Sequence, residues 1–158
     1  MSRPYVAVVG PSAGGSAELE AASEVGRLLA DRGAVVVCGG LGGAMAAACR
    51  GAKGAGGVTL GILPGADRSV ANRWVDVAVA TGLGEARNAV VVRTADAVIA
   101  VAGAYGTLSE IALALAAGTP VIGLETWELA RAGEVDAGIE QAGSPEEAVR
   151  LALAAIGH

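Results

Sequence analysis

Short apolar runs that end in glycine-rich turns recur along this chain, and each of these turns leads into a helical segment. The clearest runs cover residues 5–9, 34–38 and 97–101, and the turns after them cover 10–15, 39–43 and 102–106. Strands that are apolar at every position are typical of parallel sheets covered on both faces. Because strands and helices alternate, the sequence predicts an α/β fold: a doubly wound, mainly parallel Rossmann-like sheet with helices on both faces.

The same alternation continues along the chain. Helices are predicted over about 17–31, 44–53, 85–94 and 107–117, and further strands over 58–63, 75–79 and 120–124. A last helix begins at Ser144-Pro145, since Ser is a good N-cap and Pro suits the first helical position. Residues 125–143 have no clear pattern. A chain of 158 residues, 53% of them hydrophobic, suits one core, so we expect a single domain over residues 1–158.

Composition disfavours several classes of protein. A net charge of −5 argues against nucleic acid as a partner, because a nucleic-acid binder needs a basic face. The longest apolar stretch, 111–124, is interrupted at Gly118-Thr119-Pro120 and is too short to cross a membrane. A strand predicted from Tyr5 leaves no room for a secretory leader, so we expect a cytoplasmic protein. Cys38 and Cys49 match neither a disulfide framework nor a metal-binding spacing.

The segment 101–110 carries the clearest functional signal. Here a strand passes through a glycine-rich turn into a helix, so backbone N–H groups are exposed at the positive end of a helix dipole, where anions bind. Glu110 follows one turn into that helix, and Arg87 lies just after Gly82-Leu83-Gly84, a position suited to a phosphate contact. Turns after parallel strands meet at one edge of the sheet. The sequence therefore predicts a site for a phosphate-bearing ligand at this edge.

Simpler interpretations exist for the same residues. Thr107-Leu108-Ser109-Glu110 fits a capping box, in which Thr107 is the N-cap and Glu110 bonds back to the Thr107 N–H. Arg87 fits a solvated helix face, and Tyr105 at the tip of the turn fits either a lid or a ring that stacks on a ligand. The stretch after Pro64-Gly65 fits solvated surface better than a cover over a base; its large side chains are Arg68, Arg73 and Trp74.

Missing residues disfavour or exclude several cofactor chemistries. The first turn lacks the G-x-G-x-x-G spacing and the second strand ends in Cys38 rather than an acid, which disfavours NAD. The only lysine, Lys53, lacks the Gly-Lys-Ser/Thr context of a P-loop. It is predicted to be a solvated lysine near a helix end, and is a poor candidate for a pyridoxal phosphate Schiff base. The only histidine, His158, is the last residue, which argues against a histidine base or metal ligand.

Four motifs lie within residues 4–124: Gly39-Gly40-Leu41-Gly42-Gly43-Ala44-Met45, Gly61-Ile62-Leu63-Pro64-Gly65, Thr81-Gly82-Leu83-Gly84-Glu85-Ala86-Arg87-Asn88 and Ala102-Gly103-Ala104-Tyr105-Gly106-Thr107-Leu108-Ser109-Glu110. Together they resemble the LOG-like nucleotide-binding families. These include cytokinin-activating phosphoribohydrolases, often mislabelled lysine decarboxylases, and molybdenum cofactor carrier proteins. The last motif is similar to the family's P-G-G-x-G-T-x-x-E, in which the Gly/Thr backbone binds phosphate and the Glu acts in catalysis.

Two departures from the family pattern stand out. Ala102 and Ala104 replace the Pro and the second Gly of that motif. The hydrolases carry an Arg-Lys pair where this chain has Arg87-Asn88, so the chain is more similar to the carrier-type branch.

The turns and the resemblance together define a candidate site. The resemblance implies that Arg87 and Glu110 are catalytic, with Arg87 orienting a phosphate and Glu110 assisting bond cleavage. Ligand and phosphate contacts are expected from Gly10, Ser12, Gly39, Gly40, Gly42, Gly43, Met45, Pro64, Arg87, Asn88, Gly103, Ala104, Tyr105, Gly106, Thr107 and Glu110. We expect no required cofactor; the candidate ligands are a nucleoside monophosphate, phosphate or molybdenum cofactor.

Two functions follow from the resemblance. The first is a nucleotide- or phosphate-binding protein that hydrolyses the N-glycosidic bond of nucleoside 5′-monophosphates, as a phosphoribohydrolase does. The alternative is a non-catalytic carrier or sensor for molybdenum cofactor or a related phosphorylated ligand.

The predicted helix 107–117 is apolar nearly all round after Glu110. A helix without a polar face must be buried on every side. In a domain of this size that indicates a subunit interface, so we expect a homo-oligomer, either a dimer or a tetramer.

Overall fold

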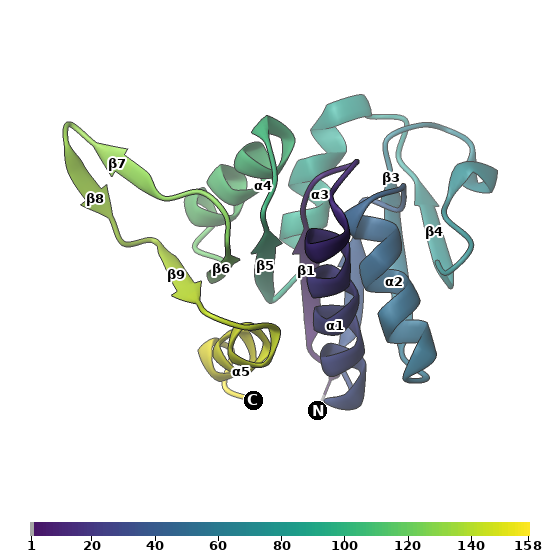
Figure 1. Cartoon of the computed structure of the whole chain (residues 1–158). Helices are drawn as coiled ribbons and strands as arrows, with labels where there is room; N and C mark the ends of the chain where they lie inside the picture. The colour runs from purple at the N-terminus through teal and green to yellow at the C-terminus, as the bar shows by residue number, and fades with distance from the viewer. Residues whose placement is uncertain (1) are drawn as a thin grey trace.

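The computed structural model describes residues 2–158, which form a seven-stranded sheet, a two-stranded hairpin and five α-helices (Figure 1). The sheet has the strand order β4-β3-β2-β1-β5-β6-β9, and every neighbouring pair is parallel. Its strands are β1 (Tyr5–Val9), β2 (Val35–Cys38), β3 (Val58–Leu63), β4 (Val77–Ala80), β5 (Ala97–Val101), β6 (Val121–Leu124) and β9 (Ile139–Ala142). The predicted doubly wound, parallel α/β sheet is confirmed.

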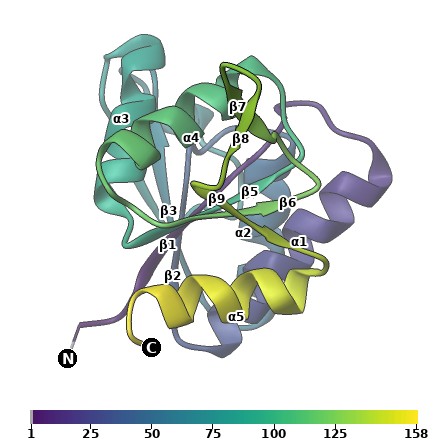
Figure 2. The ribbon, with the colours of Figure 1, turned by 90° about the vertical axis from the view of Figure 1, so that its left-hand side faces the viewer.

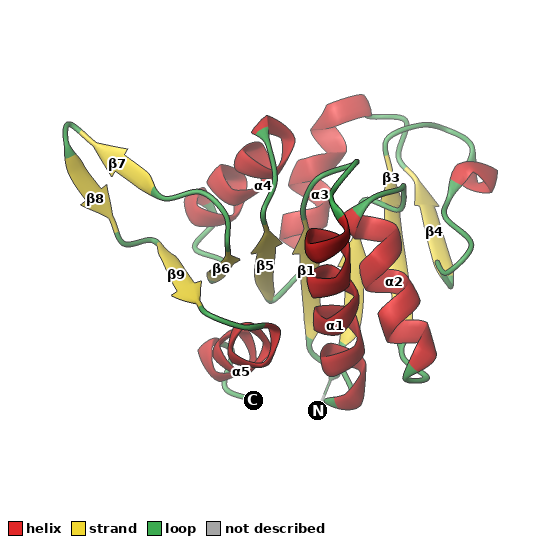
Figure 3. Cartoon of the chain, in the orientation of Figure 1, coloured by secondary structure: helices red, strands yellow, loops and turns green. Residues whose placement is uncertain are grey.

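Helices cover both faces of this sheet, as predicted (Figures 2 and 3). One face packs against α1 (Ser16–Asp31), α2 (Ala44–Gly54) and α5 (Pro145–Ala155), and the other against α3 (Arg87–Thr94) and α4 (Tyr105–Ala116). Successive side chains of a strand point to opposite faces. Val6 and Val8 of β1 therefore join the first core, whereas Ala7 and Val9 join the second.

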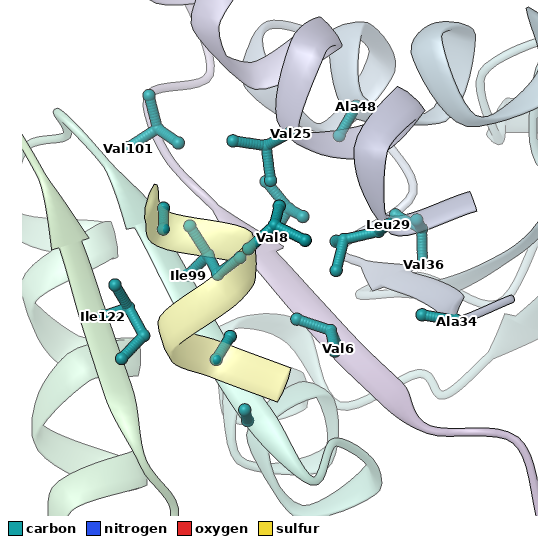
Figure 4. Packing of buried hydrophobic residues seen from close by; sticks show 14 of the residues in the cluster. Val6, Val8, Val25, Leu29, Ala34, Val36, Ala48, Ile99, Val101 and Ile122 are labelled. Carbon is teal, nitrogen blue, oxygen red and sulfur yellow. The ribbon is translucent and has the colours of Figure 1, made fainter. Parts of the chain in front are cut away.

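Figure 4 shows the first of these cores from close by. Val25 and Leu29 of α1 meet Val8 and Val36 of the sheet, and all four side chains are fully buried. The central strands are buried at almost every position on both faces. That double burial is the physical reason why their sequences are apolar throughout.

Several predicted elements need correction. The helix predicted from Thr107 begins at Tyr105, and the strand predicted over 75–79 is β4, over Val77–Ala80. The helix predicted from 85 is divided, because a short 3-10 turn over Gly84–Ala86 precedes α3.

The unpatterned stretch 125–143 contains three strands. Two of them, β7 (Leu129–Arg131) and β8 (Glu134–Asp136), form an antiparallel hairpin that projects beside β6 (Figure 1). The third, β9, extends the sheet at its edge. Only Ile139 of β9 is buried, so this strand lacks the apolar run of the central strands.

The order of strands determines where a ligand can bind. The chain moves outward from β1 through β2 and β3 to β4, and then returns to the other side of β1 as β5. The turns after β1 and β5 therefore diverge at the carboxyl edge of the sheet, the usual binding crevice of doubly wound folds. None of the helices described within residues 2–158 combines the length and hydrophobicity needed to cross a membrane.

Candidate functional site

Three glycine-rich turns pack directly against one another at this crevice. The Ala44 N–H donates to the Pro11 carbonyl over 2.9 Å, which joins the second turn to the first. A Cβ on Gly43 would lie 2.3 Å from the Pro11 carbonyl oxygen, and a Cβ on Gly10 would lie 2.7 Å from that of Val101. The contacts between the turns are therefore possible only because both residues lack a side chain.

The turns enclose a cavity of about 410 Å³. Many residues predicted for the site lie on its wall: Gly10, Ser12, Gly39, Met45, Pro64, Arg87, Asn88, Ala104, Gly106, Thr107 and Glu110. The wall also contains residues that sequence analysis did not single out: Val8, Val9, Pro11, Gly84 and Glu85. Gly84 and Glu85 lie within a quoted motif and Pro11 within the first glycine-rich turn, although none was predicted to contact the ligand, whereas Val8 and Val9 have the sequence pattern of an ordinary buried strand.

The remaining predicted residues lie outside the cavity wall. Gly40 packs against Leu63, where a Cβ would lie 2.7 Å from the leucine side chain, and Gly43 packs against the first turn. Gly103 has a φ of +103° and leaves no room for a Cβ against Thr107. Gly42 is exposed at the surface, and Tyr105 is 80% exposed.

The N-terminus of α4 presents free backbone donors to the cavity. Its N-cap is Ala104, and the first N–H bonded within the helix is that of Leu108, which donates to Ala104 over 3.0 Å. The preceding N–H groups, those of Tyr105, Gly106 and Thr107, have no acceptor within the helix. Together with Arg87 and Gly39, residues 104–107 form what we call the anion cradle.

The same geometry shows that the capping-box interpretation of Glu110 is wrong. Thr107 is not the N-cap; it lies inside the first turn of α4 and is only 3% exposed. Glu110 lies one turn further on, facing the cavity.

Glu110 is a buried carboxyl group without a partner. It is 7% exposed, and within residues 2–158 its side chain makes no hydrogen bond or ion pair. Burial raises the pKa of Glu110 to about 7, and the positive charge of Arg87 only partly opposes this effect. At neutral pH the group is therefore close to half protonated, which allows it to give or accept a proton.

Arg87 begins α3 and places its guanidinium group against Gly39. A Cβ on Gly39 would lie 2.8 Å from the guanidinium carbon and 2.7 Å from the Met45 sulfur. Arg87 Nη1 donates to Asn88 Oδ1, but the buried Nε is without a hydrogen-bond partner in the described part of the chain. Arg87 is half-buried on the cavity wall rather than on a solvated helix face. A buried donor without a partner is costly. Arg87 as a residue lies on the cavity wall, where an anion would meet its positive charge.

Within the anion cradle, a chain of hydrogen bonds connects Arg87 to the first turn of α4. Because the Asn88 oxygen accepts from Arg87, its amide nitrogen is the group that donates to Ser109 Oγ, over 3.2 Å. Ser109 Oγ in turn donates to the Gly106 carbonyl over 2.9 Å. Ser109 was quoted in a motif, but its role depends on a contact between α3 and α4 that spacing alone does not reveal.

Other residues considered from the sequence lie elsewhere. The Lys53 ammonium pairs with Asp76 at 2.9 Å and donates to the Gly57 carbonyl, so this lysine is half-buried and paired rather than solvated. Lys53 does not line the cavity, and neither does Trp74. Among residues 2–158 no group of three or more His, Cys, Asp or Glu residues is placed to hold a metal ion.

Comparison with known proteins places these features in a family. The SLOG cluster4 family matches residues 3–149. A protein from Archaeoglobus fulgidus, described as uncharacterized, is 42% identical over 132 residues, which cover 84% of this chain and 83% of that protein.

Two solved structures are similar over nearly the whole chain. The molybdenum cofactor binding protein from Rippkaea orientalis has a TM-score of 0.89 and 37% identity, with 99% of each chain covered. The molybdenum cofactor carrier protein from Chlamydomonas reinhardtii has a TM-score of 0.86 and 30% identity, with 99% of this chain and 100% of that chain covered.

Proposed function

Because the chain belongs to the SLOG cluster4 family, we propose that it binds and carries molybdenum cofactor or a closely related phosphorylated ligand. Similarity to a molybdenum cofactor binding protein and to a carrier protein over almost their full lengths supports this function. The observation that carries it is the position of Arg87, a half-buried cation on the wall of the same cavity that Ala104, Gly106 and Thr107 of the α4 N-terminus line. Arg87 and the free N–H groups of that N-terminus suit the phosphate of such a ligand.

Each part of the cradle has a separate task in this proposal. The N–H groups at residues 105–107 hold phosphate oxygens by hydrogen bonds aided by the helix dipole. Arg87 supplies a charged, planar donor group, and Asn88 and Ser109 hold it in register with α4. Gly39 provides the space that the guanidinium group occupies.

Glu110 favours a second candidate function, hydrolysis of the N-glycosidic bond of nucleoside 5′-monophosphates. A buried carboxyl group whose pKa is about 7 can protonate a leaving base or stabilise a positively charged ribose. Against this, Asn88 stands where the hydrolases that the sequence resembles have a lysine. We therefore place the carrier function first.

The test begins with protein purified from a bacterial host that makes molybdenum cofactor. Bound molybdenum is measured by mass spectrometry, and bound pterin is measured by chromatography after oxidation to a fluorescent product. If the protein is a carrier, the wild type retains bound molybdenum and bound pterin through purification, and the Arg87→Ala variant loses both. Arg93→Ala is the matched control, because Arg93 is an exposed arginine on the same helix that does not line the cavity.

Hydrolysis is tested on the same preparation by chromatography of free base from a panel of nucleoside 5′-monophosphates. Base release that disappears in Glu110→Gln, from protein that retains no molybdenum or pterin, would replace the carrier function by the hydrolase. Retention of cofactor without base release supports the carrier.

We also propose that the protein is a homo-oligomer. On α4 the apolar residues Ala112, Leu113 and Ala116 are exposed in the single chain. A second copy packed on this face would remove them from water.

A further inference from the structure

A second hollow, of about 470 Å³, lies beside the cavity that contains the anion cradle. Its wall includes Glu18, Ala102, Gly103, Glu125, Trp127 and Glu128. The turn after β5 lies between the two spaces: Ala102 and Gly103 line the hollow, and Ala104 and Gly106 line the cavity. A ligand whose phosphate lies in the cradle would reach the hollow by passing over this turn.

An aromatic pair lies at this junction. The Trp127 indole N–H donates to the Ala104 carbonyl over 3.1 Å, which holds the ring against the turn. The Tyr105 ring lies 5.8 Å from the Trp127 ring, with 32° between their planes. Tyr105 is 80% exposed and so contributes little to the core. Exposed aromatic rings beside a phosphate site are suited to stacking on a planar heterocycle.

The polar groups of the hollow are mainly hydrogen-bond acceptors. The Thr126 hydroxyl donates to the Ala102 carbonyl, and the Trp127 N–H is already used by Ala104, so neither donor is free. The Glu18 carboxylate accepts the Gly15 N–H. The carboxylates of Glu125 and Glu128 accept no hydrogen bond from residues 2–158. No basic side chain lies on the wall that this part of the chain forms. The hollow therefore complements a ring whose edge carries N–H donors.

The backbone holds one of these carboxylates in an unusual place. Ala102 and Glu125 directly follow β5 and β6, and both have left-handed φ angles, +48° and +51°. Such angles are uncommon for residues other than glycine, and they are often found at binding sites. The Ala102 N–H donates to the Leu124 carbonyl over 3.0 Å, which ties the two turns together. The backbone of Glu125 therefore starts next to the Ala102 turn, and its exposed side chain lines the hollow.

We propose that this hollow binds the planar ring of the ligand and selects a 2-amino-4-oxo heterocycle, the ring edge shared by pterins and guanine. The ring stacks on Tyr105 and Trp127, and the adjacent ring N–H and 2-amino group donate to Glu125 or Glu128. Adenine lacks this edge, because its N1 is an acceptor. The inference rests on the proposed function, since the cradle must hold the phosphate for the ring to reach the hollow.

Isothermal titration of the full chain tests this with four probes: neopterin monophosphate, GMP, AMP and ribose 5-phosphate. We expect the two 2-amino-4-oxo probes to bind at least about tenfold more tightly than AMP, because a charged acceptor would lose its donors with adenine. Tyr105→Ala keeps the backbone N–H that Tyr105 contributes to the cradle, so it should weaken these two probes at least about fivefold more than it weakens ribose 5-phosphate, whereas Tyr105→Phe should restore stacking.

The carboxylate contacts are tested by Glu125→Gln and Glu128→Gln, at least one of which should remove most of the preference over AMP. Glu134→Gln is the matched control, because Glu134 is an exposed glutamate on the hairpin outside both spaces. Tighter binding of neopterin monophosphate than of GMP would identify a pterin as the source of the ring, and the reverse would identify guanine.

The failures can be told apart. If neither ribose 5-phosphate nor the other probes bind, the cradle does not bind phosphate, and both the proposed function and the ring site are refuted. If all four probes bind equally and Tyr105→Ala changes nothing, the ring site is overturned while the phosphate site stands.

Discussion

Replacing Glu110 by Gln should change how the stability of this protein depends on pH. Burial raises the pKa of the folded-state carboxyl group from its ordinary value of 4.5 to about 7. Below pH 4.5 the group is protonated in both the folded and the unfolded chain. As the pH rises, the unfolded chain ionises first, so the wild-type protein loses stability until the folded group ionises near pH 7.

The size of this effect follows from the two pKa values. A gap from 4.5 to about 7 corresponds to a loss of about 3 kcal/mol in the free energy of unfolding across the whole range. About 2 kcal/mol of this falls between about pH 5.5 and pH 8.5, a range above the isoelectric point of 4.8. Gln keeps the shape of the side chain and does not titrate, so the variant should lack this loss.

Urea unfolding followed by circular dichroism measures the difference. Wild type and Glu110→Gln are compared at several pH values in a buffer without phosphate, because a bound anion would stabilise the folded state. We expect the stability of the wild type relative to the variant to fall steadily up to about pH 7 and then to level off. A difference that stays constant across this range would refute the argument that burial controls the ionisation of Glu110.

Three further predictions concern the cradle and the surface of α4. Gly39→Ala should destabilise the protein by about 1–3 kcal/mol in thermal or urea unfolding and should weaken phosphate binding, because the new Cβ would displace Arg87 and Met45. Gly65→Ala is the control: its Cβ would lie in open space, so neither stability nor phosphate binding should change. Asn88→Asp should weaken phosphate binding by about tenfold in calorimetry, because the new carboxylate would neutralise Arg87; unchanged affinity would exclude Arg87 as an anion ligand. Light scattering at micromolar concentration should detect a dimer or tetramer, and Leu113→Glu should dissociate it; a wild-type monomer of 15.3 kDa would refute the oligomer.

The sequence by itself determined the fold class and the edge of the sheet at which the candidate site lies. Strands buried on both faces must be apolar at every position, so β1, β2 and β5 could be recognised without any knowledge of their partners. Glycine-rich turns after such strands then indicated the carboxyl edge of the sheet. By contrast, β9 went unnoticed, because an edge strand with one buried residue has no pattern of its own.

Only the tertiary structure decided what the residues at that edge can do. Arg87 gains its place from Gly39, and its unpartnered Nε depends on which groups surround it after folding. The pKa of Glu110 is raised by burial, which no local pattern records, and spacing alone allowed the capping-box interpretation that the start of α4 at Tyr105 excludes. Trp127 lies in the stretch without a pattern, yet it meets Tyr105 beside the cradle. Burial, charge and stacking arise between segments distant in the sequence, and so they are decided by packing rather than by local propensity.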